Sequence, residues 1–119
     1  DFGVYEQQYA MFTTISAISL TAWSFTGYVT STEPYELMMY DVTIPSDGDA
    51  SASTVAQIGL TTNLASGGGD ATANRIYTAG ASIATDIAAA HQIYFITRYT
   101  NGTGTKSLTG QVTLEFEII

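Results

Sequence analysis

The last ten residues of this chain, 110–119, read GQVTLEFEII, and they decide its fold class. Apolar residues recur there at every second position, at Val112, Leu114, Phe116 and Ile118, with polar residues between them. A period of two is typical of a strand with one buried face, because successive side chains point to opposite sides of a sheet. The pattern predicts a terminal strand that packs on the core and closes the domain.

Length and composition favour a single β domain. At 119 residues the chain is long enough for one hydrophobic core, so we expect one β-sandwich domain over residues 1–119. Charged residues make up 12 % of the chain, against roughly 25 % in an average soluble protein. Threonine, serine and tyrosine suit the exposed faces of strands, whereas helical surfaces usually carry lysine, glutamate and arginine.

The charge balance excludes several classes of partner. Three basic residues face eleven acidic ones, for a formal net charge of −8. Nucleic-acid binding needs clustered lysine and arginine, and an anionic membrane surface needs them too, so we predict neither partner. No apolar run approaches the roughly 20 residues that cross a bilayer, and membrane insertion is not expected. The chain has no cysteine, which rules out disulfides and thiolate chemistry.

Strand patterns alternate with turn signals along the rest of the chain. A strand within residues 15–30 is either bent near Thr21 or split there into two. Further strands are expected within 35–44, 55–62, 74–78 and 92–99, with a first strand or an arm at 2–12. About eight short strands joined by turns predict an all-β protein, an antiparallel β-sandwich of jelly-roll type.

Two connecting segments carry expectations of their own. The alanine-rich residues 83–90 permit either one helical turn or a loop. Residues 101–104 read NGTG, a turn signal between two strand patterns, and predict a hairpin that joins the strand at 92–99 to the terminal strand. Across that hairpin Arg98 is expected to stack on a tyrosine or to pair with Glu115 or Glu117.

The segment 35–44 is apolar on both of its faces. A strand of this kind is covered on both sides, and in a small protein one cover is a second sheet or a neighbouring subunit. We therefore select candidate residues for a subunit interface: Leu37, Met39, Tyr94 and Phe116.

The order of these patterns resembles a known family. Residues 93–98 read IYFITR and are followed by the polar glycine-rich turn and the terminal G-x-V-x-L-x-F-x-I strand, while an ELMMY strand at 36–40 precedes the Asp47-Gly48 turn and the strand at 55–60. This order resembles the small trimeric jelly-roll heads of bacteriophage fibres, whose broad architecture also occurs in C1q and tumour-necrosis-factor-like domains. The resemblance implies a homotrimer displayed on a virion surface, with no cofactor.

Residues that suggest catalysis or metal binding have simpler interpretations. His91 is the only histidine, and a lone histidine at the start of a strand is usually a hydrogen-bonded turn residue. Glu115 and Glu117 are spaced like a glycosidase pair, yet alternating glutamates are common on a solvent-facing strand. Asp47 and Asp49 flank Gly48 and could hold a calcium ion, but the full spacing of a calcium loop is absent and a turn is the simpler interpretation. We expect no catalytic residues, no metal site and no enzymatic activity.

The eight tyrosines carry the potential for binding, because their rings bury area while the hydroxyl keeps a polar partner. With the polar loops they predict a shallow surface for a glycan, and the residues selected for it are Tyr28, Asn63, Tyr77 and Asn101. Two functions remain open. One is a fibre head that binds a saccharide or protein of the host cell surface, and the other is a decoration protein that binds and stabilises a viral capsid.

Overall fold

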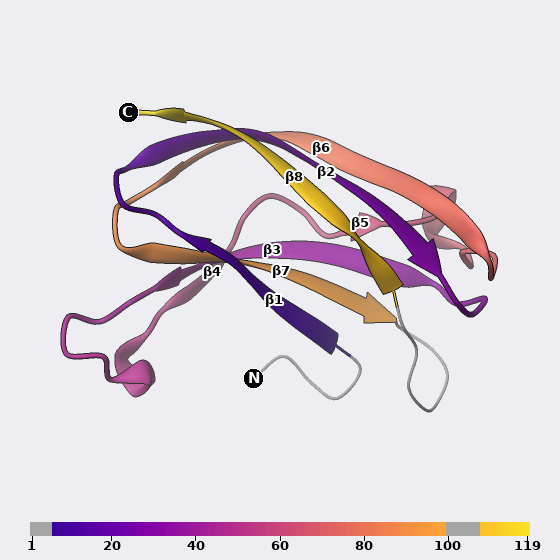
Figure 1. Cartoon of the computed structure of the whole chain (residues 1–119), viewed down its shortest axis with the longest axis horizontal. Coiled ribbons are helices and arrows are strands. Elements are labelled where there is room, and N and C mark those ends of the chain that lie inside the picture. The colour runs from indigo at the N-terminus through magenta and orange to yellow at the C-terminus, as the bar shows by residue number, and fades with distance from the viewer. Residues whose placement is uncertain (1–5, 100–107) are drawn as a thin grey trace.

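The computed structural model describes the backbone of residues 6–99 and 108–119, and it consists of two antiparallel sheets packed face to face (Figure 1). The eight strands are β1 (Glu6–Thr13), β2 (Ile18–Val29), β3 (Tyr35–Thr43), β4 (Val55–Gln57), β5 (Thr62–Asn63), β6 (Arg75–Ile87), β7 (His91–Tyr99) and β8 (Leu108–Ile118). Two single-turn 3-10 helices, η1 (Ala50–Ala52) and η2 (Ser66–Gly68), lie in the loops. The prediction of an all-β antiparallel sandwich of about eight strands is confirmed.

Each sheet has its own strand order. The five-stranded sheet runs β1-β7-β3-β4, with β5 pairing beside β4 on the same edge of β3, and the three-stranded sheet runs β6-β2-β8. The connections β1–β2, β2–β3, β5–β6, β6–β7 and β7–β8 all cross from one sheet to the other. The jelly-roll connectivity is not confirmed by these pairings.

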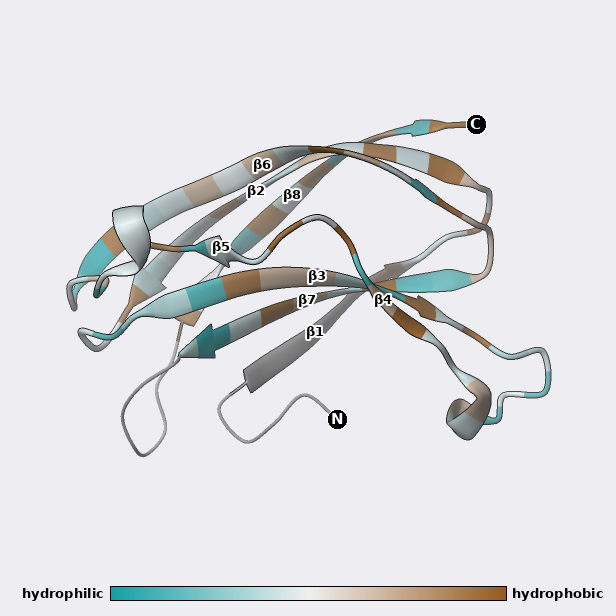
Figure 2. Cartoon of the chain, turned by 180° about the vertical axis from the view of Figure 1, so that it is seen from behind, coloured by the Kyte–Doolittle hydropathy of each residue, from teal (hydrophilic) through white to brown (hydrophobic). Residues whose placement is uncertain are grey.

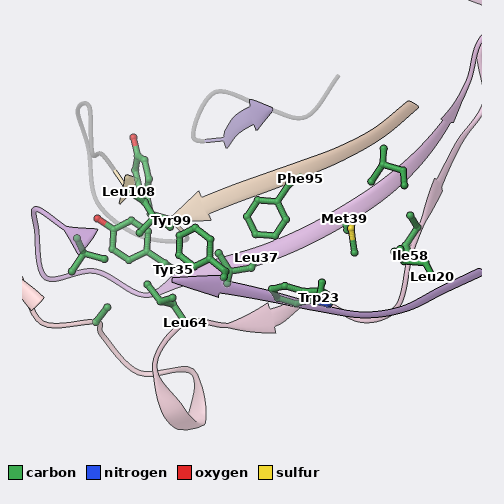
Figure 3. Close-up of a cluster of buried hydrophobic side chains, with 14 of the residues drawn as sticks. Leu20, Trp23, Tyr35, Leu37, Met39, Ile58, Leu64, Phe95, Tyr99 and Leu108 are labelled. Atoms are coloured by element: carbon green, nitrogen blue, oxygen red, sulfur yellow. The ribbon is translucent and has the colours of Figure 1, made fainter. Parts of the chain in front are cut away.

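The core lies between the sheets and follows the period of two in the sequence. Along β2, Trp23 and Phe25 are buried while Ser24 and Thr26 are exposed. Phe95 of the central strand β7 meets both aromatic rings, at centroid distances of 5.7 Å from Trp23 and 5.6 Å from Phe25. Figure 3 shows Trp23, Phe95 and Leu37 pointing into this common interior. Burial of these rings removes the largest apolar surfaces of the chain from water.

One aromatic ring also sets the spacing of β2 and β8. Gly27 and Gly110 are direct cross-strand partners, and the Phe25 ring lies over both. A Cβ added to Gly110 would come within 2.5 Å of the Thr26 carbonyl oxygen and 2.6 Å of the Phe25 ring. Glycine is needed at this position because the ring and the neighbouring backbone occupy the space of a side chain.

The segment 35–44 is covered on both faces, as its sequence predicts. Leu37 and Met39 point into the core and are 0 % and 2 % exposed. Met38 and its cross-strand partner Ile96 lie on the opposite face and are also buried. The second sheet supplies the inner cover, so Leu37 and Met39 have no surface left for a neighbouring subunit. Their assignment to a subunit interface is corrected by this burial.

Three local expectations are resolved along the chain. The strand within 15–30 is a single strand whose register shifts between Leu20 and Ala22, at the position of the predicted bend. The strand predicted at 55–62 is divided into β4 and β5 around Gly59, whose φ of +69° interrupts the extended backbone. Residues 83–87 of the alanine-rich segment 83–90 form neither a helical turn nor a loop. They belong to β6, which its pairing with β2 extends to Ile87.

The prediction that the strand at 92–99 and the terminal strand pair as a hairpin is wrong. β7 pairs with β1 and β3, while β8 pairs with β2 in the other sheet. The turn residues 100–107 themselves lie outside the described residues. Arg98 consequently pairs with Glu36 of β3, at 3.0 Å from its Nη2 to Oε1, and not with Glu115 or Glu117.

A core substitution tests the packing between the sheets. We expect Phe95→Ala to lower the free energy of unfolding by about 3–5 kcal/mol, since it removes a ring that is 1 % exposed and contacts both sheets. Ile76→Ala, at a side chain that is 72 % exposed, serves as the control and should cost less than about 1 kcal/mol. Urea unfolding followed by tryptophan fluorescence measures both. Equal losses for the two variants would contradict the assignment of Phe95 to the core.

Candidate functional site

Two loops are joined at one end of the sandwich. The turn at residues 30–34 connects β2 to β3, and the segment 64–74 connects β5 to β6. The backbones of Glu33 and Ala71 bond to each other in both directions, at 3.2 and 2.8 Å, and the Thr32 hydroxyl accepts the Ala73 N–H at 3.0 Å. The long segment 64–74 is therefore fixed onto the shorter turn by main-chain contacts.

Tyr28 and Asn74 form the exposed part of this end. Asn74 has a φ of 64°, a left-handed conformation that asparagine tolerates better than most residues, and its N–H bonds to the Val29 carbonyl. The Tyr28 hydroxyl donates to Asn74 Oδ1 at 2.7 Å. The ring of Tyr28 is 40 % exposed and lies on the outer face of the three-stranded sheet, across from Ile76. This arrangement presents a fixed aromatic ring and an amide side by side.

Tyr77 anchors the same segment from the inner side of β6. Its side chain is half-buried and packs against the core, and its hydroxyl oxygen accepts the Thr72 N–H at 2.6 Å. Hydrogen bonds from the Thr72 side chain and backbone lower the pKa of Tyr77 below its usual 10.0, because they stabilise the charged phenolate. Tyr77 thus holds the loop in place and turns little of its surface outward.

The remaining residues selected for ligand binding are placed as follows. Asn63 is exposed on β5, just before the segment 64–74, and lies against Gly68 of η2, where an added Cβ would come 3.2 Å from its Nδ2. Asn101 lies outside the described residues. Tyr28, Asn63 and Tyr77 therefore adjoin one loop. We name Tyr28, Asn63, Thr72, Asn74 and Tyr77 the loop-end surface.

Sequence reasoning missed Asn74 and Thr72. The signal for Asn74 is its position immediately before a strand and after a glycine-rich loop, where a left-handed residue often ends a turn. Thr72 had no comparable signal, because it contributes a main-chain N–H and only the tertiary structure brings Tyr77 to it.

The residues selected for a subunit interface do not form one surface. Besides the buried Leu37 and Met39, Tyr94 is half-buried on the outer face of the five-stranded sheet, opposite Tyr40. Phe116 belongs to the other sheet and is 46 % exposed at its edge. Only Tyr94 and Phe116 keep exposed area, and they lie on different sheets.

His91 and Asp41 form the one imidazole–carboxylate pair in the described chain, at 2.6 Å between Nδ1 and Oδ1. Thr14 lies beside this pair, but its hydroxyl bonds to the Ala88 and His91 carbonyls and accepts the His91 N–H. These bonds fix the turn that leads into β7 and leave the Thr14 hydroxyl directed at backbone. The arrangement matches the interpretation of His91 as a hydrogen-bonded turn residue.

The acidic candidates have structural partners. Asp47 Oδ1 accepts the Asp49 N–H, and Asp49 Oδ1 accepts the Ser51 hydroxyl at 2.7 Å and its N–H at 3.0 Å, so this segment forms a turn that caps η1. Glu115 and Glu117 are both exposed on the outer face of β8. Within residues 6–99 and 108–119 no three His, Asp or Glu side chains gather as metal ligands would, and no helix is long and apolar enough to cross a membrane.

The left-handed position tests how the loop-end surface is held. We expect Asn74→Ala to lower the free energy of unfolding by about 2 kcal/mol, since it removes the Tyr28 bond and places alanine at a positive φ. Asn74→Gly removes the bond alone and should cost about 1 kcal/mol. Urea denaturation of both variants gives the comparison. An alanine variant as stable as the glycine variant would show that backbone strain plays no part.

The capped turn gives a prediction for pH dependence. The Ser51 hydrogen bonds lower the pKa of Asp49 below its ordinary value of 3.8, so their stabilising effect is present above pH 3.8 and is lost as pH falls through the lowered pKa. Ser51→Ala removes the hydroxyl and should raise the pKa of Asp49 toward 3.8. A carbon NMR titration of the Asp49 carboxyl measures it, with Ser53→Ala as the control. An unchanged midpoint in Ser51→Ala would contradict the stated cause.

Comparison of the chain with known proteins found no matching family model, no matching curated protein and no matching solved structure.

Proposed function

We propose that this chain is a non-enzymatic module of a virion surface, of the fibre-head type, which binds a neutral saccharide of the host cell at the loop-end surface. The observation that carries the proposal is the exposed Tyr28 ring, held by Asn74 beside a loop that is itself fixed by backbone bonds. The virion setting comes from the resemblance in strand order and stays a prediction, while the trimer that the same resemblance implies is the alternative to the two-fold pairing proposed below.

The chemistry of the loop-end surface favours a sugar. A pyranose offers an apolar face and a ring of hydroxyls, which suits an exposed tyrosine ring beside an amide. Because the ring and the amide are already bonded to each other, binding has little side-chain freedom to remove. The formal net charge of −8 disfavours anionic glycans, so neutral glycans are the class we favour.

The non-enzymatic part of the proposal is supported by the placement of the reactive side chains. The Thr14 hydroxyl next to the His91–Asp41 pair bonds to backbone carbonyls, and the two exposed glutamates of β8 lie on an open sheet face. Nucleophilic catalysis needs a hydroxyl bonded to the imidazole, and a glycosidase needs two carboxyl groups that flank the bond to be cleaved. Neither requirement is met by these contacts.

The second candidate function, decoration of a capsid, is favoured by a different observation. The strands β6 and β8 are both edges of the three-stranded sheet and span 13 and 11 residues. Long edges offer unpaired backbone groups to another protein, as a subunit that assembles on a lattice requires.

An array of neutral and acidic glycans probed with the labelled chain tests the proposal. We expect neutral glycans to be bound, and we expect Tyr28→Ala to weaken that binding at least tenfold, which is about 1.4 kcal/mol. Ser82→Ala, at an exposed position on the same sheet face and six residues along β6 from the Ile76 that lies across from Tyr28, is the matched control and should leave binding unchanged. Unchanged binding of neutral glycans by the Tyr28→Ala variant, or binding of acidic glycans alone by the wild-type chain, would overturn the proposal. Binding to purified capsids without glycan binding would favour decoration.

A further inference from the structure

Among residues 6–99 and 108–119, no strand pairs with the outer edge of β8. In the described chain β8 pairs only with β2, and its other side faces no strand (Figure 1). The Ile119 N–H bonds to the Ala17 carbonyl and the Glu115 carbonyl accepts the Thr21 hydroxyl, so the odd-numbered residues direct their backbone groups toward β2. The even-numbered residues from Leu108 to Ile118 therefore direct theirs toward the open side, because backbone groups alternate along a strand.

We propose that this edge binds the β8 edge of a second copy of the chain, antiparallel, about a two-fold axis at Thr113. Such pairing joins the two three-stranded sheets into one continuous six-stranded sheet. It satisfies the outward N–H and C=O groups of both strands, which is the interaction by which strands are added to sheet edges.

The sequence of β8 is complementary to itself in this register. Full overlap of the 11 residues about Thr113 places Leu108 opposite Ile118, Gly110 opposite Phe116 and Val112 opposite Leu114 of the second copy. All three pairs lie on the inner, apolar face, and the alternation of apolar and polar residues along β8 is visible in Figure 2. An aromatic ring opposite a glycine is a favourable cross-strand pair, and Gly110 remains exposed beside the Phe25 ring.

The acidic side chains on the outer face of β8 favour the same register. Full overlap places Glu115 opposite Gln111 and Glu117 opposite Thr109, and Thr113 meets its own copy. Pairing about Glu115 or Phe116 would instead set glutamates directly opposite one another, which destabilises a sheet. The register that pairs the most backbone therefore also keeps the acidic side chains of the two copies apart.

The other edge of the same sheet is less suited to such pairing. The register of β6 against β2 shifts between Ser82 and Thr85, where two residues of β6 have no partner in the ladder. Irregularities of this kind bend a strand and disfavour edge-to-edge association. Against β2, the partners on β8 run consecutively from Leu108 to Ile118.

Apolar side chains at this edge gain a cover from the pairing. Phe116 is 46 % exposed and Ile118 is 73 % exposed, although both lie on the inner face of β8. The Phe116 ring packs on Phe12 of β1 at 6.0 Å, at the open side of the sandwich. A second copy placed along β8 brings its own Leu108 and Gly110 against these side chains and removes apolar area from water.

Cysteine cross-linking tests the register directly. The chain has no cysteine, so a single introduced cysteine forms a disulfide only between chains. In the proposed pair Thr113 meets its own copy at a site without mutual hydrogen bonds, where Cα atoms are about 4.5 Å apart and within disulfide range. We expect Thr113→Cys to give a covalent dimer under mild oxidation. Thr109→Cys, whose two copies would be about 26 Å apart, should stay uncross-linked.

Light scattering gives the second measurement. The wild-type chain should have twice the mass of 12.6 kDa, and Thr113→Glu should reduce it to the monomer by placing two like charges opposite each other. Thr78→Glu adds the same charge to an exposed position on the other edge and should leave the dimer intact. Mixing the Thr113→Glu and Thr113→Lys variants should restore the dimer.

The outcomes separate the proposal from its alternatives. A wild-type monomer, a mass three times that of the chain, cross-linking of Thr109→Cys as efficient as that of Thr113→Cys, or an unchanged dimer in Thr113→Glu would each overturn it. Folding of each variant is checked by its urea midpoint, since Thr113 is exposed and its substitution leaves the core unchanged.

Discussion

The contact of Phe95 with Trp23 and Phe25 is the interaction on which the rest of the structure depends. Phe95 belongs to the five-stranded sheet and the other two rings belong to the three-stranded sheet, so this cluster holds the two layers together. The chain has no cysteine and its described residues form no α-helix, so burial of apolar side chains between the sheets must supply the stability.

This stacking leaves two parts of the molecule available for interactions. At one end, Tyr77 and Tyr28 hold the segment 64–74 from opposite faces of the three-stranded sheet. Along one side, β8 presents a regular, unpaired edge with apolar side chains that the second sheet covers incompletely. A fixed loop suits recognition of a small polar ligand, whereas an open edge suits assembly with another strand. The two surfaces adjoin where Thr109 of β8 pairs with Tyr28 of β2, whereas Thr113 lies farther along β8 and belongs to the proposed association alone.

The candidate site shows which parts of a surface a sequence can reveal. Tyr28, Tyr77 and Asn63 were selected because tyrosine and asparagine in polar loops suit binding, and they adjoin one loop. Their different roles could not be foreseen, since Tyr77 lies on the inner face of β6 and Tyr28 lies on the outer face of β2. Leu37 and Met39 were wrongly assigned to an interface because the sequence pattern of an apolar strand is the same whether a second sheet or a second subunit covers it.

The sequence by itself determined the class of the fold and the limits of most strands, because the period of two and the turn residues are local properties. It placed the bend of β2 near Thr21, the buried central strand β7 and the strand β3 with two covered faces. Only the tertiary structure decided which strands pair. This pairing places β7 and β8 in different sheets, brings Arg98 to Glu36 and makes residues 83–87 part of β6. Pairing depends on contacts between residues distant in sequence, and no local pattern along the chain encodes them.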